Sequence, residues 1–182
     1  LISVPVGILG ATFLAEFGPE TRLAGVLRSV AKMLSGLPSI LAGVFAYGTV
    51  VLLLGRFSAV AGGVALAVLM VPTVLLTAEE ALRRVPSGMR DAAVGMGATP
   101  TQVAWTVLYP TAVPGLLTGV MLAVARAAGE TAPLIFTALF SNYWSDRVDR
   151  PTASLAVLIY NFSGSPFANQ QDLAWAAALV LV

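Results

Sequence analysis

Arg126 and Glu130 are the only charged residues in an apolar run that covers residues 111–140. A charge at the centre of a membrane-inserted helix costs about 2.5–3.5 kcal/mol, so such residues usually face a protein interior or a watery path. A separation of four residues would place both side chains on one face of a helix. Either Arg126 offers its guanidinium fork to an oxyanion with Glu130 as its partner, or the two charges neutralise each other and hold neighbouring spans together.

Most covalent chemistry is excluded by what the sequence lacks. It contains no Cys and no His, which rules out thiol nucleophiles, disulfides, Ser-His-Asp triads and most zinc sites. Lys32 is the single lysine, and no Gly-x4-Gly-Lys-[Ser/Thr] motif occurs. We therefore expect no catalytic residue, no metal ligand and no cofactor in this chain. If ATP is used, a partner chain must bind it together with Mg²⁺.

Composition indicates a membrane protein. The chain is 58% hydrophobic and 10% charged, whereas a globular domain carries about 25% charged residues. We predict an all-α, polytopic membrane protein with one transmembrane domain over residues 1–182. The net charge of +1 argues against nucleic acid as a partner and leaves membrane lipid as the expected surrounding. The predicted spans are 1–15 (partial), 37–54, 57–78, 111–140 and 173–182 (partial).

The first and last predicted spans are too short to cross a bilayer, which needs about 20 apolar residues. We therefore expect the chain to be part of a longer one, truncated at both ends.

A polar segment, residues 79–110, separates two of the spans and is predicted to form a helix-turn-helix. Its first helix should end near Met96, followed by Gly97 where a helix end needs a left-handed residue. The second helix carries start and stop signals at Thr99 (N-cap), Pro100 (first position), Gln102 (capping box) and Pro110 (stop). A further capping box is expected from Thr77 to Glu80, and Glu79, Glu80, Arg83 and Arg84 are expected to form a solvated, mutually compensating helix face.

Lys and Arg counts predict the side of the membrane that this loop faces. If residues 16–36 and 79–110 share a side, it holds Arg22, Arg28, Lys32, Arg83, Arg84 and Arg90, against Arg56, Arg147 and Arg150 opposite. The excess places the loop in the cytoplasm. The amphipathic segment 16–35 predicts either an interfacial helix with its cations near headgroups or an extension packed on neighbouring spans.

The loop resembles the cytoplasmic coupling loop of ABC importer permeases, whose pattern is Glu-Ala-Ala, three residues, Gly, nine residues, Ile, one residue, Leu-Pro. Here the same spacing holds Asp91-Ala92-Ala93, Gly97, Val107 and Tyr109-Pro110. Three further stretches narrow the resemblance to the permease subunits of phosphate importers: Gly36–Ile40, Thr77–Pro86 and Ala125–Ala138.

This resemblance implies a type I ABC importer transmembrane domain in a bacterial plasma (inner) membrane. Its implied partners are a dimer of ATP-binding subunits, a second homologous permease in a heterodimer, and a periplasmic phosphate-binding protein. The ATPase-coupling residues would be Asp91, Ala92, Ala93, Gly97 and Pro110, and the substrate path would include Arg126 and Glu130. Two alternatives stay open: a permease for another oxyanion (sulfate, molybdate or phosphonate), or a non-transporting scaffold or signalling subunit that kept the loop.

Overall fold

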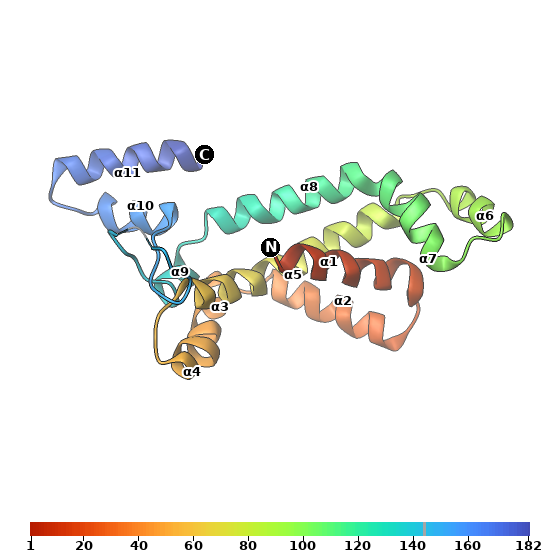
Figure 1. Ribbon diagram of the computed structural model, residues 1–182, viewed down its shortest axis with the longest axis horizontal. Helices are drawn as coiled ribbons and strands as arrows, with labels where there is room; N and C mark the ends of the chain where they lie inside the picture. The colour runs from red at the N-terminus through yellow and green to blue at the C-terminus, as the bar shows by residue number, and fades with distance from the viewer. Residues whose placement is uncertain (144) are drawn as a thin grey trace. The chain divides into compact units, whose positions relative to one another are not determined.

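The computed structural model describes residues 1–143 and 145–182, and within those ranges it contains helices and no strand, which confirms the all-α class. The helices (Figure 1) are α1 (Ser3–Thr12), α2 (Arg22–Ser35), α3 (Ser39–Ala46), α4 (Leu52–Leu54), α5 (Ala59–Arg83), α6 (Ser87–Gly95), α7 (Pro100–Val103), α8 (Tyr109–Ala128), α9 (Ala132–Ile135), α10 (Leu155–Ser163) and α11 (Ala168–Leu181). Three π-helical turns extend α1, α3 and α7: Phe13–Phe17, Tyr47–Val51 and Ala104–Leu108.

The chain folds as two compact units. The first unit comprises Leu1–Gly36 and Met70–Val124, and the second comprises Leu37–Leu69 and Ala125–Val182. Among the described residues, α5 and the continuous helix Pro100–Ala128 are each long and apolar enough to cross a membrane. A third span results if α2 and the helix Ser39–Leu54 together form one bent crossing.

The predicted span 111–140 is not one helix. Its helix ends at Ala128, Glu130 and Thr131 are not helical, and the short α9 follows. A helix continued through this region would press the ring of Pro133 against the carbonyl of Gly129 and would lose a hydrogen bond. The apolar composition of this segment therefore gave no sign that its helix is interrupted.

Two further predictions from local signals are wrong. Pro110 does not close a helix, because Pro100–Ala128 is continuous and the π-helical turn Ala104–Leu108 widens the backbone just before the proline. A π-bulge is one way for a helix to accommodate a residue without an N–H donor. Thr77 does not cap a helix either, because it lies inside α5, where its hydroxyl donates to the Thr73 carbonyl at 2.8 Å. Residues 79–83 therefore belong to α5 and not to the loop.

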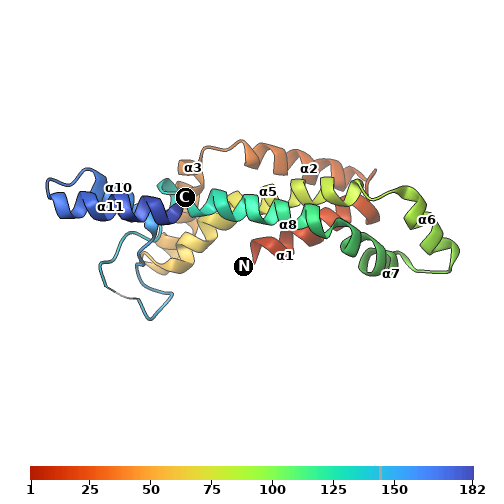
Figure 2. The same cartoon turned by 90° about the horizontal axis from the view of Figure 1, so that it is seen from above.

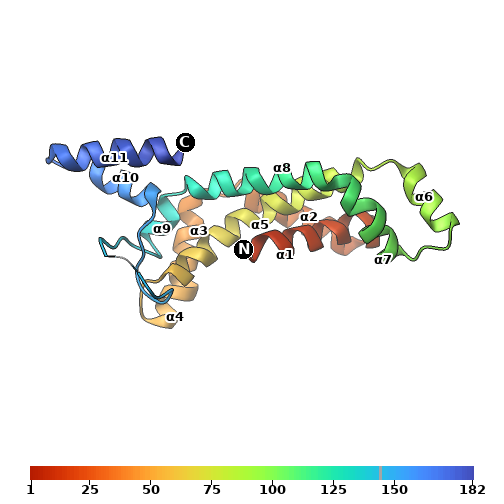
Figure 3. The same cartoon turned by 45° about the horizontal axis from the view of Figure 1, so that its top comes forward.

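In the second unit, a loop satisfies the first N–H groups of α5, which have no partners inside the helix. Ala59 N–H donates to the carbonyl of Arg150 at 3.0 Å, and Val60 N–H donates to that of Val148 at 3.2 Å. Ser58, just before the helix, donates its N–H to the carbonyl of Thr137 at 3.0 Å. The same loop carries Asp149, whose carboxylate pairs with Arg147 at 2.9 Å and with Arg56 at 3.0 Å. The hydrogen bond from Arg147 is the main cause of a lowered pKa for Asp149. The C-terminal helices α10 and α11 lie side by side as a hairpin (Figure 3).

In the second unit, α3 packs against α9 so closely at Gly43 that the position has no room for a side chain. A Cβ at this position would lie 2.7 Å from Pro133 Cα, which is backbone and cannot rotate away. We expect Gly43→Ala to lower the free energy of unfolding in detergent by about 1–3 kcal/mol, the usual cost of overpacking. Gly48→Ala is the matched control in the same helical stretch, because nothing lies within 4 Å of its added Cβ. Equal thermal stability of the two variants would contradict this packing.

In the first unit, α1 and α2 lie along the last turns of α5 (Figure 1), where Leu14, Ala24, Ala31 and Leu75 form a buried cluster. The face of α2 that packs in this interface has small side chains, since its buried residues are Ala24 and Ala31. One face of residues 16–35 is thus packed on neighbouring helices, as the second alternative predicts, while the apolar face that the first alternative places at a membrane interface remains exposed. Arg28 also turns inward, whereas the apolar residues Leu23, Val26, Val30 and Met33 are exposed.

Candidate functional site

Gly97 forms the turn between α6 and α7 as predicted, with φ of +88° in the left-handed region. Two hydrogen bonds close the end of α6 around it. Gly97 N–H donates to the Val94 carbonyl at 2.8 Å, and Ala98 N–H donates to the Ala93 carbonyl at 3.1 Å. This pair of bonds is the Schellman motif, which satisfies carbonyls that a helix end leaves unpaired. The turn is thus fixed by backbone bonds and not only by the freedom of glycine.

The start of α7 is fixed by the predicted capping box. Gln102 N–H donates to Thr99 Oγ1 at 3.3 Å, and Thr99 N–H donates to Gln102 Oε1 at 2.8 Å. Pro100 occupies the first turn of the helix. Because both helix ends that flank Gly97 are capped, the loop has a defined shape (Figure 2).

The inner face of the loop belongs to the main apolar cluster of the first unit. Ala93, Val103, Ala104 and Leu108 pack there with residues of α1 and α5 and of the segments that follow those helices: Ala11, Ala15, Ala78, Leu82 and Val85. The two alanines of the coupling pattern therefore have different roles. Ala92 is exposed, whereas Ala93 is buried with 4% of its surface accessible.

The outer face of α6 is the surface that another protein could contact. It presents Asp91 and Ala92 together with two apolar side chains, Val94 and Met96, which are 58% and 84% exposed. Within the described part of the chain, the Asp91 carboxylate has no ion-pair partner. Sequence reasoning missed Val94 and Met96, although apolar residues inside a polar loop were a signal that could have indicated them. Pro110 is exposed on the following helix and takes no part in this face.

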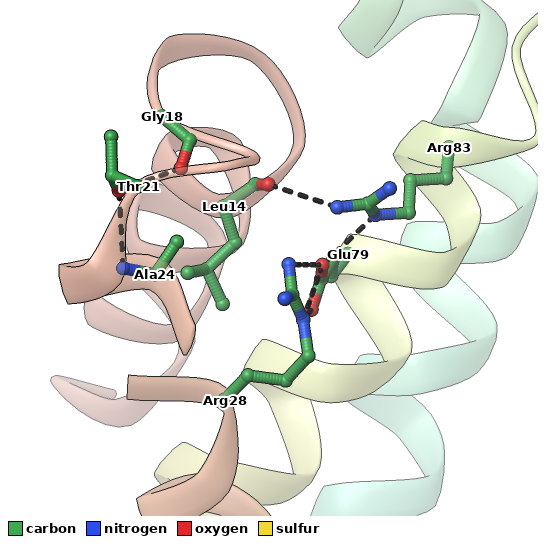
Figure 4. Close-up of polar contacts among 7 residues, drawn as sticks. All are labelled: Leu14, Gly18, Thr21, Ala24, Arg28, Glu79 and Arg83. Carbon is green, nitrogen blue, oxygen red and sulfur yellow. Dashed lines mark hydrogen bonds and ion pairs between the residues drawn. The ribbon is translucent and has the colours of Figure 1, made fainter. Parts of the chain in front are cut away.

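Glu79 forms a buried ionic cluster that the sequence did not reveal (Figure 4). Its Oε1 lies 2.6 Å from Arg28 Nη2 of α2 and 2.9 Å from Arg83 Nε one turn along α5. Arg83 Nη2 also donates to the Leu14 carbonyl at 3.2 Å. That carbonyl lacks a helical donor, because Gly18 N–H bonds to Phe13 and residue 19 is a proline. The cluster therefore joins α2, α5 and the end of α1.

The predicted solvated face is correct for one ion pair only. Glu80 and Arg84 pair across one turn of α5 and are exposed, with 65% and 77% of their side-chain surfaces accessible. Glu79 instead points at α2 and has 7% of its side chain accessible. Its main partner, Arg28, is 51 residues away in the sequence, so the pattern along α5 could not show which carboxylate is buried.

Arg126 and Glu130 do not share one helical face, because α8 ends between them. Arg126 lies in the last turn of α8, where a cation is favourable at the negative end of the helix dipole. Its Nε is 3.8 Å from Glu130 Oε1, too long for a hydrogen bond. Among the residues the structure describes, the Arg126 guanidinium makes no hydrogen bond, and its side chain is 41% accessible. The two charges therefore form an ion pair, as the charge-neutralising alternative predicts, while the guanidinium N–H groups remain without hydrogen bonds among the described residues.

The predicted residues fall into two groups. Asp91, Ala92, Ala93, Gly97 and Pro110 belong to the first unit, and Arg126 and Glu130 belong to the second. Each unit thus carries one candidate site, that of the first unit for a partner protein and that of the second for an anion.

Several known proteins are similar to this chain along its whole length. The phosphate transport system permease protein PstA of Yersinia pestis is 44% identical over 181 residues, covering 100% of this chain and 61% of that protein. The protein of the same name in Haemophilus influenzae is 43% identical over 181 residues, covering 100% of this chain and 64% of that protein. The chain thus spans less than two thirds of the length of these relatives.

A solved structure supports the same fold. A chain of the MetNI methionine ABC transporter in inward-facing conformations superposes with a TM-score of 0.77 and 23% identity, covering 100% of this chain and 79% of that chain. The family described as "Binding-protein-dependent transport system inner membrane component" matches residues 3–181. The chain belongs to this family of membrane transport permeases.

Proposed function

We propose that this chain is the core of a permease subunit that imports inorganic phosphate, with ATP hydrolysis on a partner as the energy source. The observation that carries the proposal is identity of 43–44% along the entire chain with permeases named for phosphate transport. The Arg126 guanidinium is ion-paired with Glu130 but makes no hydrogen bond among the described residues. It supports an oxyanion as substrate, since a guanidinium group matches phosphate oxygens with two parallel donors.

The outer face of α6 would receive a dimer of ATP-binding subunits, which would hold ATP and Mg²⁺. Support comes from the exposed Val94 and Met96 beside Asp91, because a protein interface combines apolar contacts with polar groups at its rim. The remaining partners would be a second homologous permease, in a heterodimer, and a periplasmic phosphate-binding protein that delivers the substrate.

The distribution of cations supports an inner-membrane orientation with this loop in the cytoplasm. Arg22, Arg28, Lys32, Arg83, Arg84 and Arg90 all belong to the first unit, which carries the loop. Arg56, Arg147 and Arg150 belong to the second unit. Loops rich in Lys and Arg remain on the cytoplasmic side.

Mechanically, the loop would act as a rigid handle. ATP binding and hydrolysis would move the ATPase subunits, and a loop with two capped helix ends would pass that movement to the packed helices without bending. Alternating exposure of the path would then carry phosphate past Arg126, where Glu130 would orient the guanidinium group.

The function is tested by reconstituting the full-length protein with its partner permease, ATPase and binding protein in liposomes. Phosphate-stimulated ATP hydrolysis and phosphate uptake are the expected results. Uptake that sulfate, molybdate or a phosphonate supports better than phosphate would assign another oxyanion. An ATPase that no substrate stimulates would indicate a scaffold or signalling subunit.

Arg126→Lys is expected to reduce phosphate uptake about tenfold or more, because it keeps the charge and removes the fork. A hydrogen bond to a charged group contributes roughly 1.5–3 kcal/mol, enough for such a change. Arg56→Lys is the matched control, since Arg56 is an exposed residue paired with Asp149. Uptake by Arg126→Lys at the wild-type rate would show that the guanidinium has no specific role.

A further inference from the structure

The end of the first helix is attached to the coupling loop by two polar contacts that the family pattern does not contain. Arg90 of α6 pairs with Glu16 in the π-helical turn that extends α1, with Nη1 2.5 Å from Oε1. Tyr109 Oη lies 2.8 Å from Thr12 Oγ1 of α1. Since the Thr12 hydroxyl donates its one hydrogen to the Ile8 carbonyl, Tyr109 is the donor in this contact.

Arg90 holds two helices at once. Its Nη2 donates to the Leu82 carbonyl at 2.7 Å, in the last turn of α5, while Nη1 faces Glu16. The two helices are themselves closely packed, because a Cβ on Gly7 of α1 would lie 2.7 Å from Val74 Cγ1 of α5. A displacement of α6 that pulls on Arg90 would therefore act on α1 and α5 together.

Stability does not explain this pair well. Both side chains are largely buried, with 22% of Arg90 and 18% of Glu16 accessible. In the part of the chain that the structure describes, Arg90 Nε and Glu16 Oε1 lack hydrogen-bond partners of good geometry. Desolvation of a buried ion pair can cancel its attraction, and a buried donor without a partner adds a further cost. The net contribution of this pair to stability is therefore expected to be small, and a role in function is the better explanation for it.

We propose that the Glu16–Arg90 ion pair is the link through which movement of α6 reaches α1 and α5, so that Arg90 is a positioning residue for ATPase coupling. This inference rests on the proposed function of the loop. It predicts that the pair sets how much phosphate is moved for each ATP hydrolysed, and not whether the protein folds or the ATPase binds.

A double-mutant cycle in the full reconstituted transporter tests the link, using Glu16→Gln, Arg90→Gln and the double variant. Each single variant is expected to lower phosphate transported per ATP hydrolysed by about fivefold or more, the lower end of coupling between sites. The double variant should be no worse than either single one, since both remove one interaction. Each single variant leaves a largely buried charge without its partner and should unfold at a lower temperature than wild type, whereas the double variant should recover most of that stability. The ratio of phosphate to ATP is therefore compared only among complexes that have assembled. Arg84→Gln, in the exposed Glu80–Arg84 pair, is the control and should keep the ratio.

Unchanged ratios in both single variants, or losses that multiply in the double variant, would overturn the link while leaving the proposed function intact. A wild-type complex without substrate-stimulated ATP hydrolysis would instead remove the proposed function, and the link with it.

A covalent replacement tests the link if the glutamine variants assemble poorly. The chain has no cysteine, so Glu16→Cys and Arg90→Cys can be joined by a short thiol-reactive crosslinker. Because the two positions are expected to stay together through the cycle, the crosslinked protein should regain the wild-type ratio. A crosslink that stops transport, or that leaves the ratio as low as in the unlinked double variant, would overturn the inference.

Discussion

Gly97→Val is expected to assemble in the membrane and yet lose phosphate uptake driven by ATP hydrolysis. With φ of +88°, Gly97 has a conformation that costs an L-residue roughly 1–2 kcal/mol, and a β-branched side chain fits it poorly. Nothing lies within 4 Å of an added Cβ, so the effect is conformational and not a clash. The turn should reshape, the two Schellman hydrogen bonds should weaken, and the outer face of α6 should tilt away from the ATPase.

The measurement compares phosphate uptake and ATP hydrolysis in the same proteoliposomes. Gly88→Val is the matched control, because Gly88 lies in α6, the helix that Gly97 follows, with open space around an added Cβ and without a left-handed φ. Hydrolysis without uptake is expected for Gly97→Val, and near-normal coupling is expected for Gly88→Val. Normal uptake by Gly97→Val would count against a role for the turn in coupling.

Glu79→Gln is expected to lower the free energy of unfolding by about 1.5–3 kcal/mol, the contribution of hydrogen bonds to a charged group, because Glu79 is buried while Arg28 and Arg83 keep 27% and 47% of their side chains accessible. The variant removes the carboxylate from between two guanidinium groups, which then remain next to each other without a counter-charge. Arg28 would no longer be held against α5, so the contact of α2 with the rest of the first unit should weaken. Thermal unfolding in detergent, followed by circular dichroism, measures the loss.

The neighbouring Glu80→Gln is a close control for this experiment. Glu80 also pairs with an arginine four residues on, but both partners are exposed. An exposed pair contributes about 0–1 kcal/mol, so this variant should unfold near the wild-type temperature. Similar losses for Glu79→Gln and Glu80→Gln would show that burial of Glu79 does not govern the cluster.

Local signals in the sequence predicted the loop well, because its structure depends on neighbouring residues. The left-handed Gly97 and the Thr99–Gln102 capping box each involve groups only a few positions apart, and both are present. The same reasoning was wrong at Thr77 and Pro110. A capping residue inside a packed helix bonds back to its own helix, and a π-helical turn can carry a helix through a proline.

Contacts between distant segments were beyond the reach of the sequence pattern. The sequence did not distinguish Glu79 from Glu80, because the difference arises from Arg28 of α2, which lies beside Glu79 only in the fold. Likewise, nothing near Arg90 in the sequence indicated that it pairs with Glu16. The break after Ala128 was missed for another reason, since hydropathy measures how apolar a segment is and not whether its backbone stays helical. Arg126 and Glu130 were therefore found by their charge and do form an ion pair, while the prediction that they share one helical face was wrong.

Site-directed crosslinking from α6 tests most directly whether this loop receives an ATPase. A single cysteine is placed at Ala92, which is exposed, or at Ala93, which is buried in the apolar cluster. In cells that contain the complete transporter, a thiol-reactive crosslinker should join the ATPase to Ala92→Cys and should fail with Ala93→Cys. If the ATPase is never captured from Ala92, while the assembled complex is present in the same cells, the loop does not seat the ATPase.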